Sequence, residues 1–477
     1  MQDWIKVTLL LCTYGMVREI RPSEPFVSEF LLGEWREITE EQLNRDVYPI
    51  GTYAYLAQLV LIFLITDFLR FKPVIILSGL SGIAVYSILL WTTSLEWLQA
   101  SQFFYGTYMA TEVAYLTYIY AKVDPARYPL VSSCTRIAAL SGRFLSGVSS
   151  QLLTHFGLMD YRQLNYITFT AQIVATFGAF WLPSVQYGIY FHRRTSTLSN
   201  PIDKPHIQNK RTFRTNVVEA ATLIARHARS AYTRPKVIVW STLYACALAI
   251  FVQVQIYVQL LWKQIQDESG RPVAYNGAVE ATQTLLGAGG AYVASMLTWS
   301  SLPAPIAAVQ GIAIFLGTYI PNVFASYAGY IVMGMLFHYT ITLGASPNVK
   351  LFSFYTAAIV DPTYISSQNL PNYINSYLIP IVQALWTFHI GDAVSKIACQ
   401  LHDDSCFGLI FGINTLAGTA LQSILTLVLI QTLELPIPSQ YYVLSGLLML
   451  LASGWALGLM VHSCRQKPTN GNKQFSS

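Results

Sequence analysis

The chain has 477 residues, of which 53% are hydrophobic and only 11% are charged, whereas a soluble domain carries about 25% charged residues. This composition excludes an ordinary soluble protein and predicts a polytopic all-α membrane protein. The net charge of +5 says little about partners by itself, because in a membrane protein the distribution of Lys and Arg between the loops carries the information.

Apolar stretches long enough to cross a bilayer, about 20 residues each, recur through the first part of the chain. They lie near residues 4–20, 50–69, 73–93, 97–121, 129–154 and 162–186. The first has no small-residue cleavage site after it, so we interpret it as a span and not as a removable signal peptide. The segment after it, residues 18–46, has eight Asp/Glu against four Arg and modestly favours an outside location.

The fourth stretch, residues 103–124, carries one carboxylate near its middle, Glu112. A charge at the centre of a spanning helix costs at least about 2.5 kcal/mol, so it usually marks a pathway or a site. Helical spacing places Tyr105, Tyr108 and Tyr115 on the face of Glu112. Such a face suits a flat, cationic or hydrogen-bonding ligand. In the alternative interpretation, Glu112 pairs with an arginine of a neighbouring helix and only fixes packing.

A polar stretch, residues 191–236, separates the two parts of the chain. It holds ten Lys/Arg against two acids, Asp203 and Glu219, and such a loop stays in the cytoplasm. Its charges alternate with Ser, Thr, Asn and Pro, which is typical of a solvated topology determinant and not of a patch that binds nucleic acid. No nucleic-acid partner is expected.

A second group of apolar stretches follows this loop. They lie near residues 237–262, 275–298, 302–320, 323–344, 407–432 and 438–462. Two halves of six spans, joined by a basic cytoplasmic loop, predict the major facilitator architecture with twelve transmembrane helices. The expected units are an N-terminal half (1–190), the loop (191–236), a C-terminal half (237–463) and a tail (464–477), with both termini in the cytoplasm.

Residues 345–381 interrupt the C-terminal half. They contain the loop signals Pro347 and Asp361-Pro362. A thirteenth span here would put the basic tail outside, against its charge. We therefore expect an insertion that adds no net span.

Five segments carry a family resemblance. They are RPSEPF (21–26), TDFLRFKP (66–73), ATEVAYLTYIYAKVD (110–124), YNGAVEA (275–281) and FGINT (411–415). In this combination and order they resemble the reduced folate carrier and thiamine transporter family, solute carrier family 19. The resemblance implies a secondary-active vitamin transporter of the plasma membrane that works by alternating access, coupled to a proton or an anion.

The resemblance also implies a substrate site. Glu24, Glu112, Tyr115 and Asn276 match the positions that surround the aminopyrimidine of thiamine in its carriers. A carboxylate and an amide can satisfy the edge of that ring while tyrosines cover its face. A thiamine-like substrate is therefore preferred.

Several positions depart from one branch of the family or the other. Gln422 and Gly334 stand where folate carriers have basic residues. Gly51 stands where thiamine carriers have a tryptophan, although Tyr48 remains to stack on a ring. Arg143 stands where a tyrosine is expected, so it neutralises Glu112 or receives an anion. A reduced folate or other organic-anion carrier is accordingly the alternative.

The resemblance pairs Asp67 with Arg136 across two helices, as a structural ion pair or part of a conformational switch. His338 and the segment 389–392 (HIGD) are candidate proton carriers, although a histidine in an apolar span is usually only hydrogen-bonded.

No catalytic motif occurs, and the six cysteines have no metal-ligand spacing. We therefore expect no enzyme activity, no cofactor and no metal. A membrane receptor that binds the same vitamin without transporting it remains the alternative from another class.

Overall fold

The computed structural model describes residues 3–123, 128–185, 213–270, 274–296, 303–343 and 407–466. Within these ranges the chain is helical and contains no strand. The expected insertion at 345–381, the segment 389–392 and the tail beyond residue 466 lie outside the described residues. The all-α class expected from the composition is confirmed.

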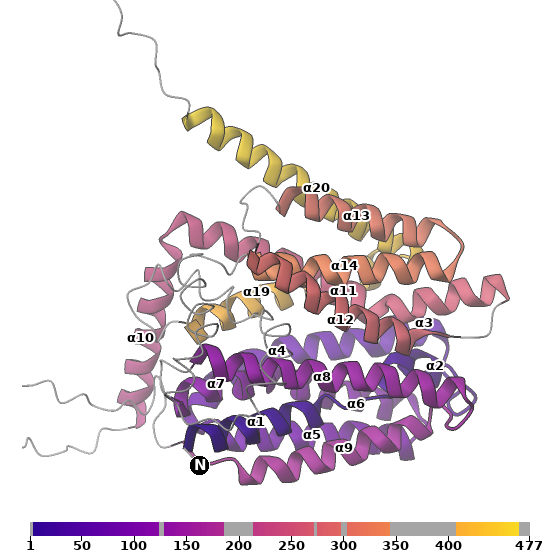
Figure 1. Cartoon of the computed structure of the whole chain (residues 1–477), viewed down its shortest axis with the longest axis horizontal. Coiled ribbons are helices and arrows are strands. Elements are labelled where there is room, and N and C mark those ends of the chain that lie inside the picture. The colour runs from indigo at the N-terminus through magenta and orange to yellow at the C-terminus, as the bar shows by residue number, and fades with distance from the viewer. Residues whose placement is uncertain are drawn as a thin grey trace, which may run out of the picture.

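The N-terminal helices form one bundle, drawn in indigo to magenta in Figure 1. They are α1 (Asp3–Arg18), the short η1 (Glu24–Phe26), α2 (Val27–Leu31), α3 (Glu40–Gln42) and η2 (Leu43–Val47), α4 (Tyr48–Phe68), α5 (Lys72–Trp91), α6 (Leu95–Ala110), α7 (Glu112–Lys122), α8 (Tyr128–His155) and α9 (Gln163–Trp181). The stretch predicted at 97–121 forms two helices, because the regular helix is interrupted at Thr111.

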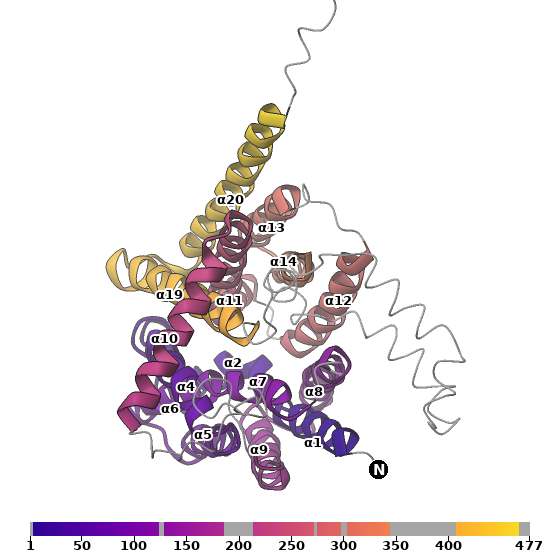
Figure 2. The ribbon, with the colours of Figure 1, turned by 90° about the vertical axis from the view of Figure 1, so that its left-hand side faces the viewer.

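The C-terminal helices pack above this bundle in the same view (Figure 1). They are α11 (Pro235–Ser269), α12 (Asn276–Met296), α13 (Pro303–Tyr319), α14 (Val323–Leu343), α19 (Phe407–Thr426) with η5 (Leu427–Thr432), and α20 (Ile437–Gln466). Seen end-on, the two groups of helices face each other across the middle of the molecule (Figure 2).

The basic stretch predicted as a loop contains a helix, α10 (Phe213–Tyr232). This helix runs across the other helices and not along them, at the end of the bundle away from α2 and α3 (Figures 1 and 2). Of its side chains, Arg226 and Arg229 are exposed. Such an orientation fits a helix that lies flat at a membrane surface.

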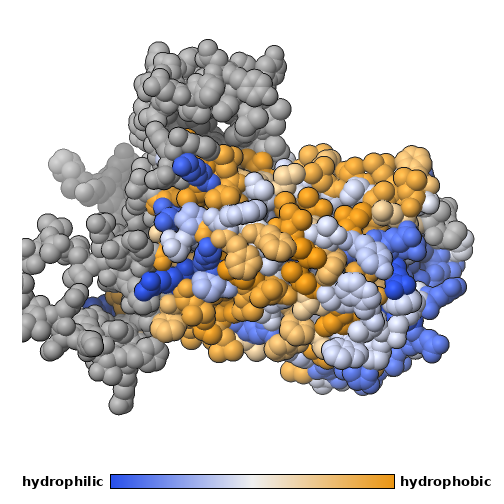
Figure 3. Space-filling view, turned by 90° about the horizontal axis from the view of Figure 1, so that it is seen from below, coloured by the Kyte–Doolittle hydropathy of each residue, from blue (hydrophilic) through white to orange (hydrophobic). Residues whose placement is uncertain are grey.

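Five helical segments within the described residues are long and apolar enough to cross a membrane. They are Glu40–Thr66, Lys72–Trp91, Val237–Ser269, Gly412–Thr432 and Ile437–Val461, and the apolar helix Pro303–Tyr319 is shorter. Apolar side chains cover most of the face shown in Figure 3, and hydrophilic ones gather toward the end where α2 and α3 lie. The count of twelve spans stays a prediction.

The two halves are joined at this α2/α3 end. The largest cluster of buried side chains joins Tyr48, Leu43 and Val47 of the N-terminal half to Trp262 and Tyr257 of α11. The Tyr48 and Tyr257 rings meet edge-to-face, with centroids 5.6 Å apart. This contact closes the interface at one end of the molecule.

Candidate functional site

α1, the helix at the first predicted span, ends at Arg18, and residues 19–23 connect it to η1 in the interior of the N-terminal half without regular helical structure. Side chains of other helices satisfy the exposed backbone groups there. The Arg18 carbonyl accepts hydrogen bonds from the Tyr108 hydroxyl (3.1 Å) and the Gln172 amide (3.0 Å). The Arg21 N–H donates to the Ser146 hydroxyl, 2.7 Å away. Non-helical backbone is tolerated at such a depth only where protein or a cavity surrounds it.

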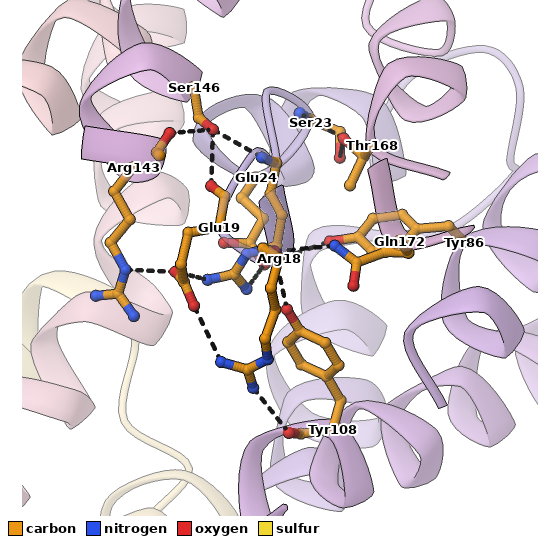
Figure 4. A network of polar contacts seen from close by, with 12 residues as sticks. Arg18, Glu19, Ser23, Glu24, Tyr86, Tyr108, Arg143, Ser146, Thr168 and Gln172 are labelled. Atoms are coloured by element: carbon orange, nitrogen blue, oxygen red, sulfur yellow. Dashed lines mark hydrogen bonds and ion pairs between the residues drawn. The ribbon is translucent and has the colours of Figure 1, made fainter. Parts of the chain in front are cut away.

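Glu19 lies at the centre of this break and is only 3% exposed. Its carboxylate binds three guanidinium groups: Arg21 and Arg143 at 2.6 Å and Arg18 at 3.1 Å (Figure 4). Arg143 comes from α8, so one buried carboxylate ties α1, the break and α8 together. The segment 18–46, whose acidic charge modestly favours an outside location, therefore buries its first charges, Arg18, Glu19 and Arg21.

Arg18 also links this network to Glu112. Its guanidinium lies 4.0 Å from the Glu112 carboxylate and 4.3 Å above the ring of Tyr108. A pocket of about 270 Å³, which includes space open to solvent, lies next to this pair. Its walls come from α1, Glu19, α7 and α8, and they are Gly15, Arg18, Glu19, Glu112, Tyr115, Leu116, Thr135, Arg136 and Ala139.

Glu112 is both partnered and accessible. It begins α7, directly after the break at Thr111, and its side chain keeps 23% of its surface exposed. An ion pair at 4.0 Å leaves room for a stronger partner, because charge-assisted hydrogen bonds lie at about 2.7–2.9 Å. Glu112 therefore has a long ion pair with Arg18 and contributes to the wall of the pocket, and its role as a substrate ligand stays a prediction.

The two tyrosines named with the site hold the helices together. Tyr115 is 5% exposed, and its hydroxyl donates to the Leu11 carbonyl of α1 at 3.0 Å. A Cβ at Gly15 would come within 2.2 Å of that hydroxyl, so the contact requires the glycine. The Tyr48 hydroxyl lies 2.9 Å from that of Ser28. Tyr115 still lines the pocket, whereas Tyr48 lies in the closed α2/α3 end.

Glu24 faces the interior between the halves. One of its carboxylate oxygens accepts a hydrogen bond from Arg21 and another from the Tyr86 hydroxyl at 3.3 Å. The side chain keeps 34% of its surface exposed. Gln259 of α11 donates to the Glu24 carbonyl at 2.8 Å, so the C-terminal half contacts this residue directly.

The C-terminal half contributes Asn276 and, one turn later on α12, Glu280. Asn276 is 1% exposed and accepts a hydrogen bond from the Tyr327 hydroxyl at 2.9 Å. Glu280 accepts one from the Tyr330 hydroxyl, also at 2.9 Å. Glu280 interacts electrostatically with Arg143 and Glu24, so acidic and basic groups of both halves lie near one another in the interior.

Arg143 is the basic side chain at this space. Its Nε donates to Glu19, while its two terminal nitrogens point away from the network (Figure 4). The side chain is 37% exposed, against 4% for Arg18 and 6% for Arg21. Arg143 can therefore offer two parallel N–H groups to an anion, or to a carboxylate of the protein.

Polar contacts between the halves concentrate at the α2/α3 end. Lys263 of α11 lies 3.3 Å from the Glu29 carboxylate, and Gln259 accepts from the Ser28 N–H at 3.1 Å. Further pairs are Arg45 with Glu434 (3.1 Å), Tyr53 with Gln431 (3.0 Å) and Thr52 with Gln422 (3.2 Å). These contacts close the interior space from this side.

The positions that depart from the family pattern have local explanations. A Cβ at Gly51 would meet the Gln102 side chain at 2.6 Å, so a tryptophan could not fit without moving Gln102. At Gly334 the Gln283 side chain fills the corresponding space, 2.3 Å from such a Cβ. Gln422 is 1% exposed and bonds to Gln253 at 3.2 Å, which makes it part of the packed interface.

The expected pairing of Asp67 with Arg136 cannot be followed, because the Asp67 side chain lies outside the described residues. Arg136 lines the pocket beside Glu112. His338 is partly exposed, and its ring lies 5.4 Å from that of Phe337.

Sequence reasoning missed Glu19, Arg21 and Glu280 as members of the site. Glu19 and Arg21 were counted as loop charges, although the alternation of Arg and Glu over residues 18–24 beside an apolar stretch was a signal of internal pairing. Glu280 is part of the motif YNGAVEA and was not singled out. Helical spacing from Asn276 (i, i+4) would have placed it on the same face.

The sequence matches the family model described as "Reduced folate carrier" over residues 2–353 and 348–443. The human reduced folate transporter is 29% identical over 99% of this chain and 76% of its own length. Human thiamine transporter 1 is 28% identical over 94% of this chain and 88% of its own length. Folate-like transporter 3 of Caenorhabditis elegans is 31% identical over 94% of this chain and 94% of its own length.

Solved structures with a similar fold include the nucleoside transporter NupG, with a TM-score of 0.54 and 12% identity over 95% of this chain and 99% of that one. The human organic anion transporter MFSD10 (TETRAN) gives a TM-score of 0.52 at 12% identity, over 95% and 100%. At this identity the likeness concerns the fold alone. It confirms the major facilitator architecture expected from the sequence.

Proposed function

The chain belongs to the reduced folate carrier family, whose members are membrane transporters and not enzymes, and on that premise we propose that it carries a thiamine-like vitamin cation by alternating access. Its relatives include folate transporters and thiamine transporters, and together they support vitamin transport as the activity of this chain. The preference for a thiamine-like substrate is the finer proposal, and it rests on the interior charges.

The observation that carries this preference is the exposure of carboxylates in the interior. Glu24 and Glu112 keep 34% and 23% of their side-chain surface free, whereas Arg18 and Arg21 keep 4% and 6% and are bound to Glu19. A cation entering between the halves therefore meets free carboxylate surface, and a charge-assisted hydrogen bond there contributes about 1.5–3 kcal/mol.

One observation favours the second candidate, a folate or other organic anion. The two terminal nitrogens of Arg143 point away from the Glu19 carboxylate that its Nε binds (Figure 4), and the side chain is 37% exposed. A guanidinium binds carboxylates through two parallel hydrogen bonds, so Arg143 suits the carboxylates of an anionic vitamin.

The proposed transport cycle opens the two ends of the molecule in turn. The contacts at the α2/α3 end, among them Lys263 with Glu29, belong to the outer gate if residues 18–46 lie outside. This topology also places both termini and residues 191–236 in the cytoplasm of a plasma-membrane protein. Asp67 and Arg136 are proposed to be coupled on the opposite, cytoplasmic side, at the segment 67–73.

Uptake of labelled thiamine and labelled folate, measured side by side in cells that express the chain, tests the proposal. Saturable thiamine uptake supports it and excludes a receptor without transport, whereas uptake of folate alone favours the second candidate. The Arg143→Tyr variant separates the two roles of this side chain. Thiamine uptake rises if Arg143 narrows a thiamine site, and folate uptake falls if it binds an anion.

A further inference from the structure

Glu280 differs from the other carboxylates that face the interior. Glu19 binds three arginines, Glu24 binds Arg21 and Glu112 lies near Arg18. Across the described part of the chain, no ion pair joins Glu280 to a basic side chain, and its hydrogen bond comes from the neutral Tyr330 hydroxyl. Glu280 is partly buried, and an ionised carboxylate with reduced access to water is costly unless a cation or a proton neutralises it.

The groups that interact with Glu280 come from three elements that pack on α12. Tyr330 comes from α14, Arg143 from α8 and Glu24 from η1. Arg143 is therefore the one cation among them, and in this structure its Nε is bound to Glu19 on the far side. Its terminal nitrogens are left to reach another carboxylate.

The contact between α8 and α12 lies beside this pair. Gly147 and Gly277 approach so closely that a Cβ on either would be 2.7 Å from the other's carbonyl oxygen. Arg143 precedes Gly147 by one helical turn, and Glu280 follows Gly277 by three residues. Small residues let two helix backbones approach closely, and a shift of α8 against α12 would change the distance between Arg143 and Glu280.

We propose that Glu280 is the proton-binding group that couples transport to a proton gradient. In the arrangement seen here the carboxyl binds a proton and keeps its hydrogen bond with Tyr330. When α8 and α12 shift and the terminal nitrogens of Arg143 reach it, the proton passes to water in the interior space. The carboxylate then pairs with Arg143.

This proposal rests on transport as such, and it does not depend on which vitamin is carried. It assigns the coupling ion that the proposed function leaves open. A carboxylate that alternates between a proton and an internal cation is a means of linking a conformational change to proton movement.

The test compares the native chain with Glu280→Gln, which keeps an acceptor for Tyr330 but cannot bind a proton. In proteoliposomes, an imposed pH gradient should drive accumulation of the transported vitamin by the native chain. The variant should lose this accumulation and keep exchange of labelled for unlabelled vitamin at equal pH within about threefold. Glu268→Gln, which alters an exposed carboxylate of α11, is the matched control and should behave like the native chain.

Three results would overturn the proposal: no response of the native chain to the gradient, accumulation that survives in Glu280→Gln, or loss of exchange in that variant at normal reconstitution. If thiamine is not carried but folate is, the preference for thiamine fails and the same assay proceeds with folate.

A measurement without substrate completes the test. The infrared spectrum of the purified native chain should contain the carbonyl stretch of a protonated carboxylic acid. Glu280→Gln should lack this band and Glu268→Gln should keep it. An identical band in both variants would assign the proton to another group and overturn the proposal.

Discussion

Replacing Glu19 by Gln should destabilise the protein strongly, although the two side chains have nearly the same shape. Glu19 is 3% exposed and accepts from three guanidiniums at 2.6, 2.6 and 3.1 Å. In the Glu19→Gln variant, Arg18 keeps its ion pair with Glu112, and Arg21 keeps its ion pair with Glu24. Arg143 loses the one ion pair that it makes within the described residues. Removing one partner from a buried ionic network costs about 3–5 kcal/mol.

The assay is thermal unfolding of the detergent-purified chain, and size-exclusion chromatography with fluorescence detection measures the fraction that stays folded. Glu34→Gln, at an exposed carboxylate, is the control and should change stability by no more than about 0.5 kcal/mol. Adding Arg143→Gln to Glu19→Gln should recover part of the loss, because it removes the cation left without its carboxylate. Equal stability of the Glu19 and Glu34 variants, or strictly additive losses in the double variant, would refute the reasoning.

Three further predictions concern the site and the gate. Glu112→Gln should weaken apparent vitamin affinity by about ten- to a hundredfold at normal surface expression; unchanged affinity with lower thermal stability would make Glu112 a packing charge. Gly15→Ala should lower surface expression, because its Cβ would lie 2.2 Å from the Tyr115 hydroxyl, and Tyr115→Phe in the same chain should restore it; a normal level in Gly15→Ala alone would contradict this. Glu29→Lys should slow uptake by setting like charges together at the α2/α3 end, and Lys263→Glu should restore it; a double variant as slow as the single one would argue against a gate there.

The sequence by itself determined the class of protein and the approximate positions of the helices along the chain. Apolar stretches of about 20 residues separated by charged loops specify spanning helices, because a bilayer requires each backbone polar group to be satisfied within its own segment. The predicted stretches at 73–93 and 323–344, for example, coincide with α5 and α14. Glu112 was visible for the same reason, since a charge within an apolar run stands out.

Only the tertiary structure decided which charges meet. Glu19 and Arg143 are 124 residues apart in the sequence and 2.6 Å apart in space. Periodicity within one helix cannot specify a partner on another, because helix packing brings distant turns together. It likewise could not show that Tyr115 bonds to α1 or that Glu280 has no ion pair among the described residues. Those properties depend on side chains from helices that are far apart in the sequence. They arise only when these helices pack together in the folded bundle.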